Sequence, residues 1–416
     1  MTSVSRIENV FNGIVSYCTS NMEVICNLLE IYKGLKKPIL IEATANQVNQ
    51  DGGYTGMTPI DFSNRVRALA EAKDFPLENL ILGGDHLGPL TWKNYPEEVA
   101  MFKAKKLIHA FVEAGFQKIH LDTSMKLATD DTFGQLSLEK IANRGCDLFL
   151  IAEEVSKGKE NNCFYTIGSE VPIPGGEVVS QISVTKKEDV KKTVEAYRQV
   201  FFQRGVSEEQ WQKIKAIVVQ PGVEFSTDTK ISFDKSQATD LADLMQHDLS
   251  GFVYEGHSTD YQSRDNLKAM VASGIKILKV GPALTFAYRA VLDKLEIIEK
   301  ELMGIELSNF NNNLNKVMNA TTKYWSNYYH KDMSFNHGSS YLDRERYYLV
   351  DDNVIESIKK LKSNVDKYST ESQRYKWFPR EFSDYESCAF KGGFSDFVIL
   401  KAIEFEVSKY EYAICE

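Results

Sequence analysis

An acid and an imidazole stand side by side in residues 83–89, which have the sequence GGDHLGP. The apolar stretch 77–82 predicts a short buried strand that delivers Asp85 and His86 into a Gly/Pro turn. This pairing suits carbon–carbon bond chemistry next to a carbonyl, in which a metal polarises the oxygen and a carboxylate moves the proton. Seven other strand-like runs also end in polar residues, which strengthens this interpretation.

His86 and His257 are the candidate metal ligands, with Glu170 as the third. Imidazole and carboxylate together form a common donor set for zinc or manganese at a catalytic site with an open position. We therefore expect a divalent metal, Zn or Mn, as cofactor; the alternative for each histidine is a hydrogen-bonded structural role. His120 lies two residues before Asp122 on the same face of its strand, and is either a ligand or a core-filling residue.

Carboxylates at several strand ends are candidates for proton transfer. Asp85 and Glu255 come first, with Asp122 and Glu224 behind them. Beside a metal-bound ketone, such groups could deprotonate a hydroxyl and start a retro-aldol cleavage. The alternative is that some of them orient the metal-ligating histidines. The predicted catalytic set is Asp85, Glu255 and Asp122.

Amide side chains gather just after the second strand-like run. Asn46, Gln47, Asn49 and Gln50 are typical of contacts to sugar hydroxyls, although a polar surface loop would have the same composition. The residues that we expect to bind substrate are Glu42, Asn46, Gln47, Gln220, Glu224, Ser258 and Lys279.

Eight apolar, β-branched runs with amphipathic helical segments between them must position these groups. Short continuous apolar strands of this kind predict a parallel sheet covered on both faces. Eight such units predict an α/β fold, a (β/α)8 TIM barrel, whose active site lies at the carboxyl ends of the strands. The doubly wound open sheet is the alternative, but no GxGxxG follows the first run. The predicted strands are residues 13–18, 38–43, 80–84, 118–122, 164–168, 216–220, 252–255 and 275–280.

The chain has 416 residues, which is long enough for one barrel and an extension. We predict a TIM barrel over residues 1–300 and a helical extension packed on it over 301–416. Residues 340–348 of the extension are rich in tyrosine and arginine. That composition suits plain packing, and also an interface or a lid.

Composition narrows the partners and the compartment. The net charge of −9 argues against a nucleic-acid partner. No apolar run approaches the ~20 residues of a membrane span, and the polar N-terminus lacks a signal-peptide core. We expect a cytoplasmic protein without a membrane partner. The six cysteines show no CxxC spacing, so we expect free thiols.

The chain resembles the GatZ/KbaZ family, known as the non-catalytic subunit of class II D-tagatose-1,6-bisphosphate aldolase. The resemblance implies a TIM barrel in an oligomer with a separate catalytic aldolase subunit, which this chain would stabilise and help to full activity. It also implies a place in galactitol, tagatose or amino-sugar catabolism. It is carried by residues 41–50, 52–59, 82–89, 118–122, 218–225, 257–262 and 278–286.

The family is similar in fold to the class II aldolases themselves, which carry an Asp-His pair after strand three, a Glu after strand five and a His after each of strands six and seven. This chain matches with Asp85-His86, Glu170 and His257, but residues 220–225 contain no histidine. The phosphate-binding glycine cluster after strand seven is also thinned. At the first strand, Ser20-Asn21 stands where the family has Ala-His.

Three functions follow. The family favours an aldolase subunit, which we take as the main hypothesis. The thinned phosphate loop favours a self-sufficient, metal-dependent D-tagatose/D-fructose 4-epimerase that cleaves and re-forms the C3–C4 bond; such enzymes are recognised among similar sequences. A non-enzymatic sugar-binding barrel is the third. The expected small-molecule partner is a ketohexose or ketohexose phosphate.

Overall fold

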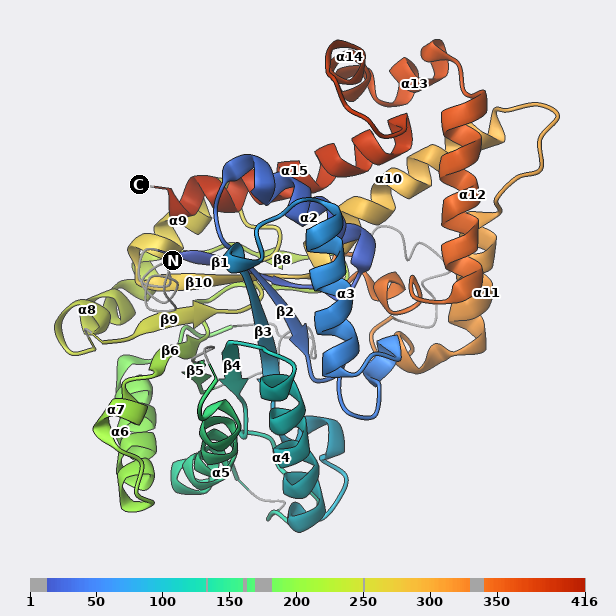
Figure 1. Ribbon diagram of the computed structural model, residues 1–416. Coiled ribbons are helices and arrows are strands. Elements are labelled where there is room, and N and C mark those ends of the chain that lie inside the picture. The colour runs from blue at the N-terminus through green and yellow to red at the C-terminus, as the bar shows by residue number, and fades with distance from the viewer. Residues whose placement is uncertain are drawn as a thin grey trace.

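Eight parallel strands close into a barrel in the computed structural model, which describes residues 13–131, 134–159, 163–168, 182–249, 251–329 and 340–415. Around the ring the order is β1-β10-β9-β6-β5-β4-β3-β2 (Figure 1). The predicted TIM barrel is therefore confirmed. The strands are β1 (Ile14–Cys18), β2 (Ile39–Thr44), β3 (Leu80–Leu87), β4 (Lys118–Leu121), β5 (Phe164–Ile167), β6 (Ile214–Val219), β9 (Val253–Gly256) and β10 (Ile275–Val280).

Helices connect successive strands and cover the outside of the barrel (Figure 1). A short hairpin of β7 (Glu224–Phe225) and β8 (Lys230–Ile231) follows β6. Helix α3 begins at Thr58, whose side chain forms a capping box with Asp61. The barrel helices are α2 (Met22–Leu35), α3 (Pro59–Ala72), α4 (Glu97–Glu113), α5 (Leu138–Ser156), α6 (Lys187–Gln203), α7 (Glu208–Trp211), α8 (Thr239–His247), α9 (Arg264–Ala272) and α10 (Pro282–Lys300).

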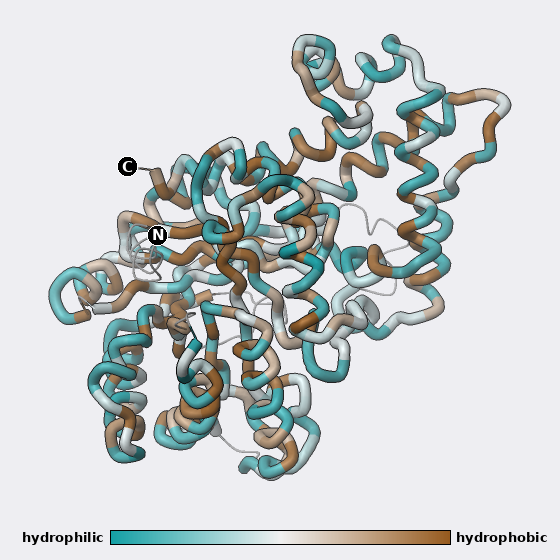
Figure 2. Tube along the Cα trace, viewed as in Figure 1, coloured by the Kyte–Doolittle hydropathy of each residue, from teal (hydrophilic) through white to brown (hydrophobic). Residues whose placement is uncertain are grey.

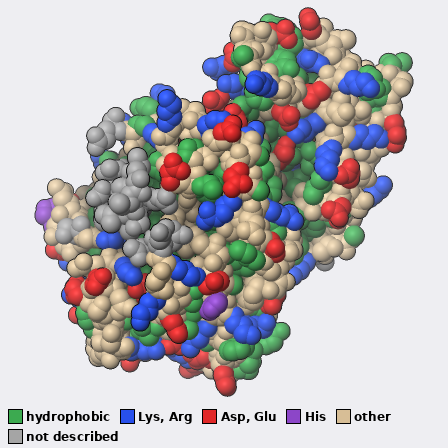
Figure 3. All heavy atoms as spheres, viewed as in Figure 1, with side chains coloured by type: hydrophobic (Ala, Val, Ile, Leu, Met, Phe, Trp, Pro, Cys, Tyr) green, Lys and Arg blue, Asp and Glu red, His purple; other side chains and the backbone are tan. Residues whose placement is uncertain are grey.

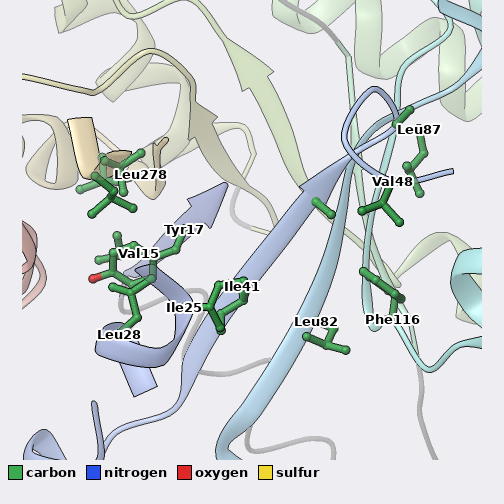
Figure 4. Packing of buried hydrophobic residues seen from close by; sticks show 14 of the residues in the cluster. Val15, Tyr17, Ile25, Leu28, Ile41, Val48, Leu82, Leu87, Phe116 and Leu278 are labelled. Carbon is green, nitrogen blue, oxygen red and sulfur yellow. The ribbon is translucent and has the colours of Figure 1, made fainter. Parts of the chain in front are cut away.

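The main hydrophobic core lies between the strands and these helices. Figure 4 shows Val15 and Ile41 of the strands beside Ile25 and Leu28 of α2, and all four are buried. A separate apolar layer closes the barrel interior. Its members come from seven different strands: Ile14, Leu40, Ile81, Phe164, Ala216, Val253 and Ile277.

Strand alternation places polar layers above this apolar layer. Two residues further along a strand, the side chain returns to the same face of the sheet. Glu42 therefore lies one layer above Leu40, and Glu255 one layer above Val253. A further step of two places His257 above Glu255, at the carboxyl end of the barrel. Gly83 makes room for Glu42, because a Cβ at this glycine would lie 2.6 Å from Glu42 Cγ.

The segment after α10 contains helices that stand beside the barrel and one that returns across it (Figure 1). Helix α15 packs against α2, α9 and α10, and Tyr410 donates a hydrogen bond to the carbonyl of Thr259 at 2.9 Å. Figure 2 shows hydrophobic residues in the barrel strands and along α15. The helices are α11 (Phe310–Ala320), α12 (Asp352–Tyr368), α13 (Glu371–Trp377), α14 (Pro379–Ser387) and α15 (Phe394–Ile414).

The surface is mixed in charge. On the face that Figure 3 shows, lysine and arginine side chains are interspersed with aspartate and glutamate. In the part of the chain that the structure describes, no helix combines the length and apolar character that crossing a membrane requires. All six cysteines lie in that part and are free thiols, as predicted.

Candidate metal and substrate site

A bulge at the end of β3 turns His86 into the barrel. β3 pairs with β2 in regular register as far as Asp85, but its pairing with β4 shifts between Gly84 and Leu87. His86 lies in this shift with a φ of 48°. A non-glycine residue with positive φ costs of order 1–3 kcal/mol, and such residues gather at functional sites. The strand is thus longer than predicted, and its irregular end presents the Asp-His pair.

Three imidazoles meet at this point. The ring centroid of His86 lies 4.9 Å from that of His120 and 4.9 Å from that of His257, and the last two are 5.4 Å apart. One ligand atom from each of these rings and from Asp85 lie within 4.8 Å of one another. We call Asp85, His86, His120 and His257 the histidine cluster. His120, for which the sequence left two roles open, is therefore placed beside the predicted ligands.

Each ring is oriented by an acceptor on one nitrogen. His86 Nδ1 lies 3.0 Å from Asp122 Oδ2, and His257 Nε2 lies 3.0 Å from Glu255 Oε1. His120 Nε2 lies 2.9 Å from the carbonyl oxygen of Gly168. Carboxylate and carbonyl acceptors behind imidazoles are the usual outer contacts of metal-ligating histidines. Asp122 and Glu255 are thus placed to orient His86 and His257.

The contacts of His120 place its ring beside Asp85. His120 Nε2 lies 2.9 Å from the Gly168 carbonyl oxygen, and Nδ1 accepts the His86 N–H at 3.2 Å. Nδ1 also lies 2.9 Å from Asp85 Oδ1, and the Lys279 ammonium contacts the same carboxylate oxygen. Two ligands of one tetrahedral zinc ion, each about 2.0–2.2 Å from it, lie roughly 3.3–3.6 Å apart, slightly more than the 2.9 Å between His120 Nδ1 and Asp85 Oδ1. With His86 and His257, the donor set fits zinc or manganese.

Two lysines neutralise the carboxylates below the histidine cluster. Lys118 Nζ lies 2.9 Å from Glu42 Oε1 and 2.8 Å from Glu255 Oε2. Lys279 Nζ lies 2.8 Å from Glu255 Oε1 and also contacts Asp85. We call Glu42, Lys118, Glu255 and Lys279 the charged layer. It is buried, so each charge depends on its partners for stabilisation.

These charges shift pKa values in the cluster. Burial raises the pKa of the Asp85 carboxyl, but His86 and Lys279 lower it by more, so it lies well below its ordinary value. Burial and Lys279 hold the pKa of His257 well below its ordinary value. Burial lowers the pKa of His86, but Asp85 and Asp122 raise it by more. At neutral pH, Asp85 is an anion and His257 a neutral imidazole, which are the forms that bind metals.

A cavity of about 290 Å³ opens above the histidine cluster. Its volume lies at the small end of the range of ligand pockets, which begins at about 300 Å³. The predicted site residues that line it are Asn46, Gln47, Asp85, His86, Asp122, His257, Ser258 and Lys279.

Other predicted residues lie outside the cavity lining. Glu42 and Glu255 lie below it in the charged layer. Gln220 Oε1 accepts the N–H groups of Gly222 at 2.8 Å and Val223 at 3.1 Å, which fixes the turn after β6. Glu224 Oε1 accepts the Phe225 N–H in the hairpin. Glu170 lies outside the described residues.

All four amides have local partners. Asn46 Oδ1 accepts from Thr91 Oγ1 at 3.3 Å, and Gln47 Oε1 accepts the Thr44 N–H at 2.8 Å. Asn49 Oδ1 accepts the N–H groups of Asp51 and Gly53, and Gln50 Nε2 donates to the carbonyl of Lys103. Asn46 and Gln47 are the pair that reaches the cavity. Asn46 and Gln47 thus both reach the cavity and help to hold the loop, whereas Asn49 and Gln50 do not line the cavity.

The outer wall of the cavity comes from the C-terminal segment, which the sequence did not assign to the site. The signal was the density of tyrosine and arginine in residues 340–348, for which plain packing was the favoured explanation over an interface or a lid. The wall also includes a residue just after α11. We call Tyr328, Leu342, Arg344, Arg346 and Tyr347 the outer wall.

The fold and this cavity define a TIM-barrel protein with three histidines and an aspartate that could hold a metal ion beneath a cavity. Residues 3–415 match the family model described as D-tagatose-1,6-bisphosphate aldolase subunit GatZ/KbaZ-like. The chain belongs to this family, which confirms the resemblance in the sequence. The structure is similar to the crystal structure of a probable tagatose 6 phosphate kinase from Sinorhizobium meliloti 1021, with a TM-score of 0.87 and 36% identity over 97% of this chain and 100% of that one.

Two aldolases match more distantly. The YdjI aldolase from Escherichia coli K12 has a TM-score of 0.43 and 14% identity, over 87% of this chain and 96% of its own. The fructose-bisphosphate aldolase from Campylobacter jejuni has a TM-score of 0.49 and 14% identity, over 88% of this chain and 94% of its own.

Proposed function

We propose that this chain holds a divalent ion, Zn²⁺ or Mn²⁺, and a ketohexose or ketohexose phosphate in its own barrel. In this proposal it is a subunit of class II D-tagatose-1,6-bisphosphate aldolase, and supports the activity and stability of a separate catalytic subunit. The observation that carries the site is the meeting of three imidazoles and Asp85 beneath a cavity of about 290 Å³. Family membership supports the partnership.

The residues around the cavity have distinct roles in this proposal. A divalent ion, when bound, polarises the carbonyl oxygen of a ketose. Asp85 and Asp122 line the cavity, where a carboxylate can take the proton of a substrate hydroxyl as a carbon–carbon bond breaks. Lys279 contacts Asp85 and balances its charge. Glu255 holds His257 from below.

A self-sufficient 4-epimerase is the second candidate function. One chain contributes the histidine cluster with Asp85, the further cavity residues Asp122 and Asp260, and the amides Asn46 and Gln47. A retro-aldol step followed by re-addition on the other face needs no group beyond these and the ion. This candidate therefore predicts activity without a partner, whereas the aldolase subunit predicts activity that depends on one.

The test is ¹³C NMR of D-tagatose incubated with the metal-loaded protein alone, in parallel with D-tagatose 1,6-bisphosphate cleavage by a catalytic aldolase subunit with and without this chain. Stimulated cleavage with no sugar conversion supports the aldolase subunit. D-Fructose formed by the protein alone supports the epimerase. If the protein binds the sugar but shows neither stimulated cleavage nor D-fructose formation, the result supports a non-enzymatic barrel and contradicts both enzymatic functions.

His86→Ala should abolish whichever activity is found, because it removes a cluster imidazole. His109→Ala is the matched control, since His109 is exposed on α4. Equal activity of His86→Ala and wild type would contradict the proposed site.

A further inference from the structure

We infer that Arg344 and Arg346 form an anion subsite in the outer wall, which selects sugars with a phosphate or carboxylate at the end remote from the histidine cluster. The inference rests on the proposed function for the sugar and assigns the residues that read its charge. Both arginines line the same cavity as His86 and His257. They come from the C-terminal segment, so that segment completes the site.

The Arg344 side chain is fixed by its neighbours but keeps a hydrogen-bond donor without a partner. The residue is only 7% exposed, and its guanidinium lies over the Tyr328 ring, 3.2 Å from the centroid. Nη1 donates to the Tyr347 hydroxyl at 3.0 Å. Nε is buried and has no hydrogen-bond partner. A buried donor left unpaired is unfavourable, and a bound anion would give it a partner.

Arg346 donates to the same Tyr347 hydroxyl as Arg344. Its Nη2 donates to the Tyr347 hydroxyl at 3.3 Å, and its Nη1 donates to the backbone carbonyls of Leu342 and Asp343. The Tyr347 oxygen therefore accepts from two guanidinium groups, as an oxygen of a phosphate or carboxylate would. Burial raises the pKa of Tyr347, but Arg346 and Arg344 lower it by more.

Neither guanidinium has a carboxylate partner within ion-pair distance among residues 13–131, 134–159, 163–168, 182–249, 251–329 and 340–415. Arg289 provides the contrast. Its Nε lies 2.9 Å from Asp343 Oδ1 and its Nη1 lies 3.0 Å from Asp293 Oδ2. Arginine forks match phosphate and carboxylate oxygens. The guanidinium groups of Arg344 and Arg346 lie at the cavity wall without a carboxylate partner in the described parts of the chain. They can therefore bind an anionic ligand.

Side-chain contacts fix the outer wall to the barrel. Asp343, between the two arginines in sequence, binds Arg289 and accepts a hydrogen bond from Thr285 Oγ1 at 2.5 Å, and both partners lie on α10. Tyr261 donates to the carbonyl of Tyr341 at 2.7 Å. The guanidinium groups are therefore preorganised, which lowers the entropy cost of binding an anion.

Calorimetric titration of the metal-loaded protein with four probes tests this inference: D-tagatose, D-tagatose 6-phosphate, D-tagaturonate and inorganic phosphate. We expect the charged sugars to bind about 10- to 100-fold more tightly than D-tagatose, the range of one or two charge-assisted hydrogen bonds. Preference for the phosphate or for the carboxylate identifies which anion the subsite takes. Equal affinity for all three sugars would overturn the inference while leaving the proposed function standing.

Arg344→Ala and Arg346→Ala should each remove most of this preference, because each should weaken binding of the charged sugars far more than binding of D-tagatose. Arg264→Ala is the matched control, because Arg264 is exposed and lies over Tyr412 away from the cavity. A preference retained in the double variant would overturn the inference. If Arg344→Ala loses metal and folded structure, Arg344→Lys keeps the charge without the fork and should lose part of the preference.

Competition in the wild-type protein needs no variant. Inorganic phosphate should displace D-tagatose 6-phosphate but not D-tagatose, and displacement of neither would overturn the inference. A protein that binds inorganic phosphate through Arg344 and Arg346 but no sugar at all would keep the anion subsite and contradict the proposed function.

Discussion

The histidine cluster and the outer wall face the same cavity but are positioned in different ways. The cluster residues Asp85, His120 and His257 extend from hydrogen-bonded parallel strands, and their spacing follows from strand register. The outer wall comes from a segment without strands, which Asp343 and Arg289 tie to α10. The barrel strands thus position the candidate metal-binding residues of the histidine cluster. The candidate substrate-binding residues of the outer wall are positioned instead by side-chain contacts to α10.

Among the predicted effects on stability, the largest is expected in the charged layer of the barrel. Lys118→Met should lower the free energy of unfolding by about 3–5 kcal/mol, because it leaves Glu42 and Glu255 buried without one of their cations. Chemical denaturation measures the loss. Lys276→Met, which changes a partly exposed lysine on β10, is the control and should cost less than about 1 kcal/mol. A loss below 1 kcal/mol for Lys118→Met would mean that the layer does not support the site.

The ion pair between Asp343 and Arg289, which joins the outer wall to α10, should give the next largest effect on stability. Asp343→Asn weakens the pair with Arg289 and should cost about 2–3 kcal/mol of stability. It should also reduce the preference for D-tagatose 6-phosphate without changing metal content, which separates the wall from the cluster. Glu208→Gln breaks the exposed pair with Arg198 and should cost under about 1 kcal/mol. Loss of metal in Asp343→Asn would show that the two regions are not independent.

Asp122 tests the cluster without removing a ligand. Asp122→Asn weakens the hold on His86 Nδ1 and should lower metal affinity about 10- to 100-fold, or about 1.4–2.7 kcal/mol. Competition with a metal-binding dye measures the affinity. Asp131→Asn, a change at a nearby exposed acid, should leave it unchanged. Unchanged affinity in Asp122→Asn would remove Asp122 from the metal site.

A pH effect on stability is expected at Glu345, which lies between Arg344 and Arg346 in the sequence. Burial raises the pKa of Glu345 to about 7, with Asp343 adding to the shift and Arg289 opposing it. Because an unfolded glutamate titrates near 4.3, the folded state holds this proton more tightly. Its contribution to stability is present below about pH 4 and is lost as the pH rises through about 7.

Glu345→Gln should therefore be more stable than wild type at pH 8, by about 1–2 kcal/mol, and nearly equal to it at pH 4.5. Denaturation at the two pH values measures the difference. Glu356→Gln, at an exposed position on α12, should show the same change at both pH values. A Glu345→Gln variant that is less stable at pH 8 would show that the carboxylate is ionised and paired.

The barrel could be predicted because its strands are continuous apolar runs, and all eight appear where the sequence placed them. Asp85, His86 and His257 could be predicted as site residues because strand ends converge in this fold. The role of His120 could not be decided, since a histidine inside a strand fills a layer as readily as it binds a metal. The bulge that turns His86 depends on the pairing of β3 with β4, which residue types do not reveal.

The outer wall could not be predicted for a different reason. Arg344 and Tyr347 reach the cavity only because α10 and the later helices bring a distant segment back to the barrel mouth. Gln220 shows the converse case. Its position after β6 suggested a substrate contact, but its side-chain oxygen is engaged by the turn that it caps. Long-range packing placed the outer wall at the cavity, and local hydrogen bonds engaged the Gln220 side chain. The sequence alone determines neither.

The most direct test of the metal site is anomalous diffraction from crystals of the wild-type protein grown with Zn²⁺ or Mn²⁺, recorded at the absorption edge of each metal. The histidine cluster predicts one dominant peak between the imidazoles of His86, His120 and His257, next to Asp85. Bound metal elsewhere with no peak at this position would contradict the site on which the proposed function rests.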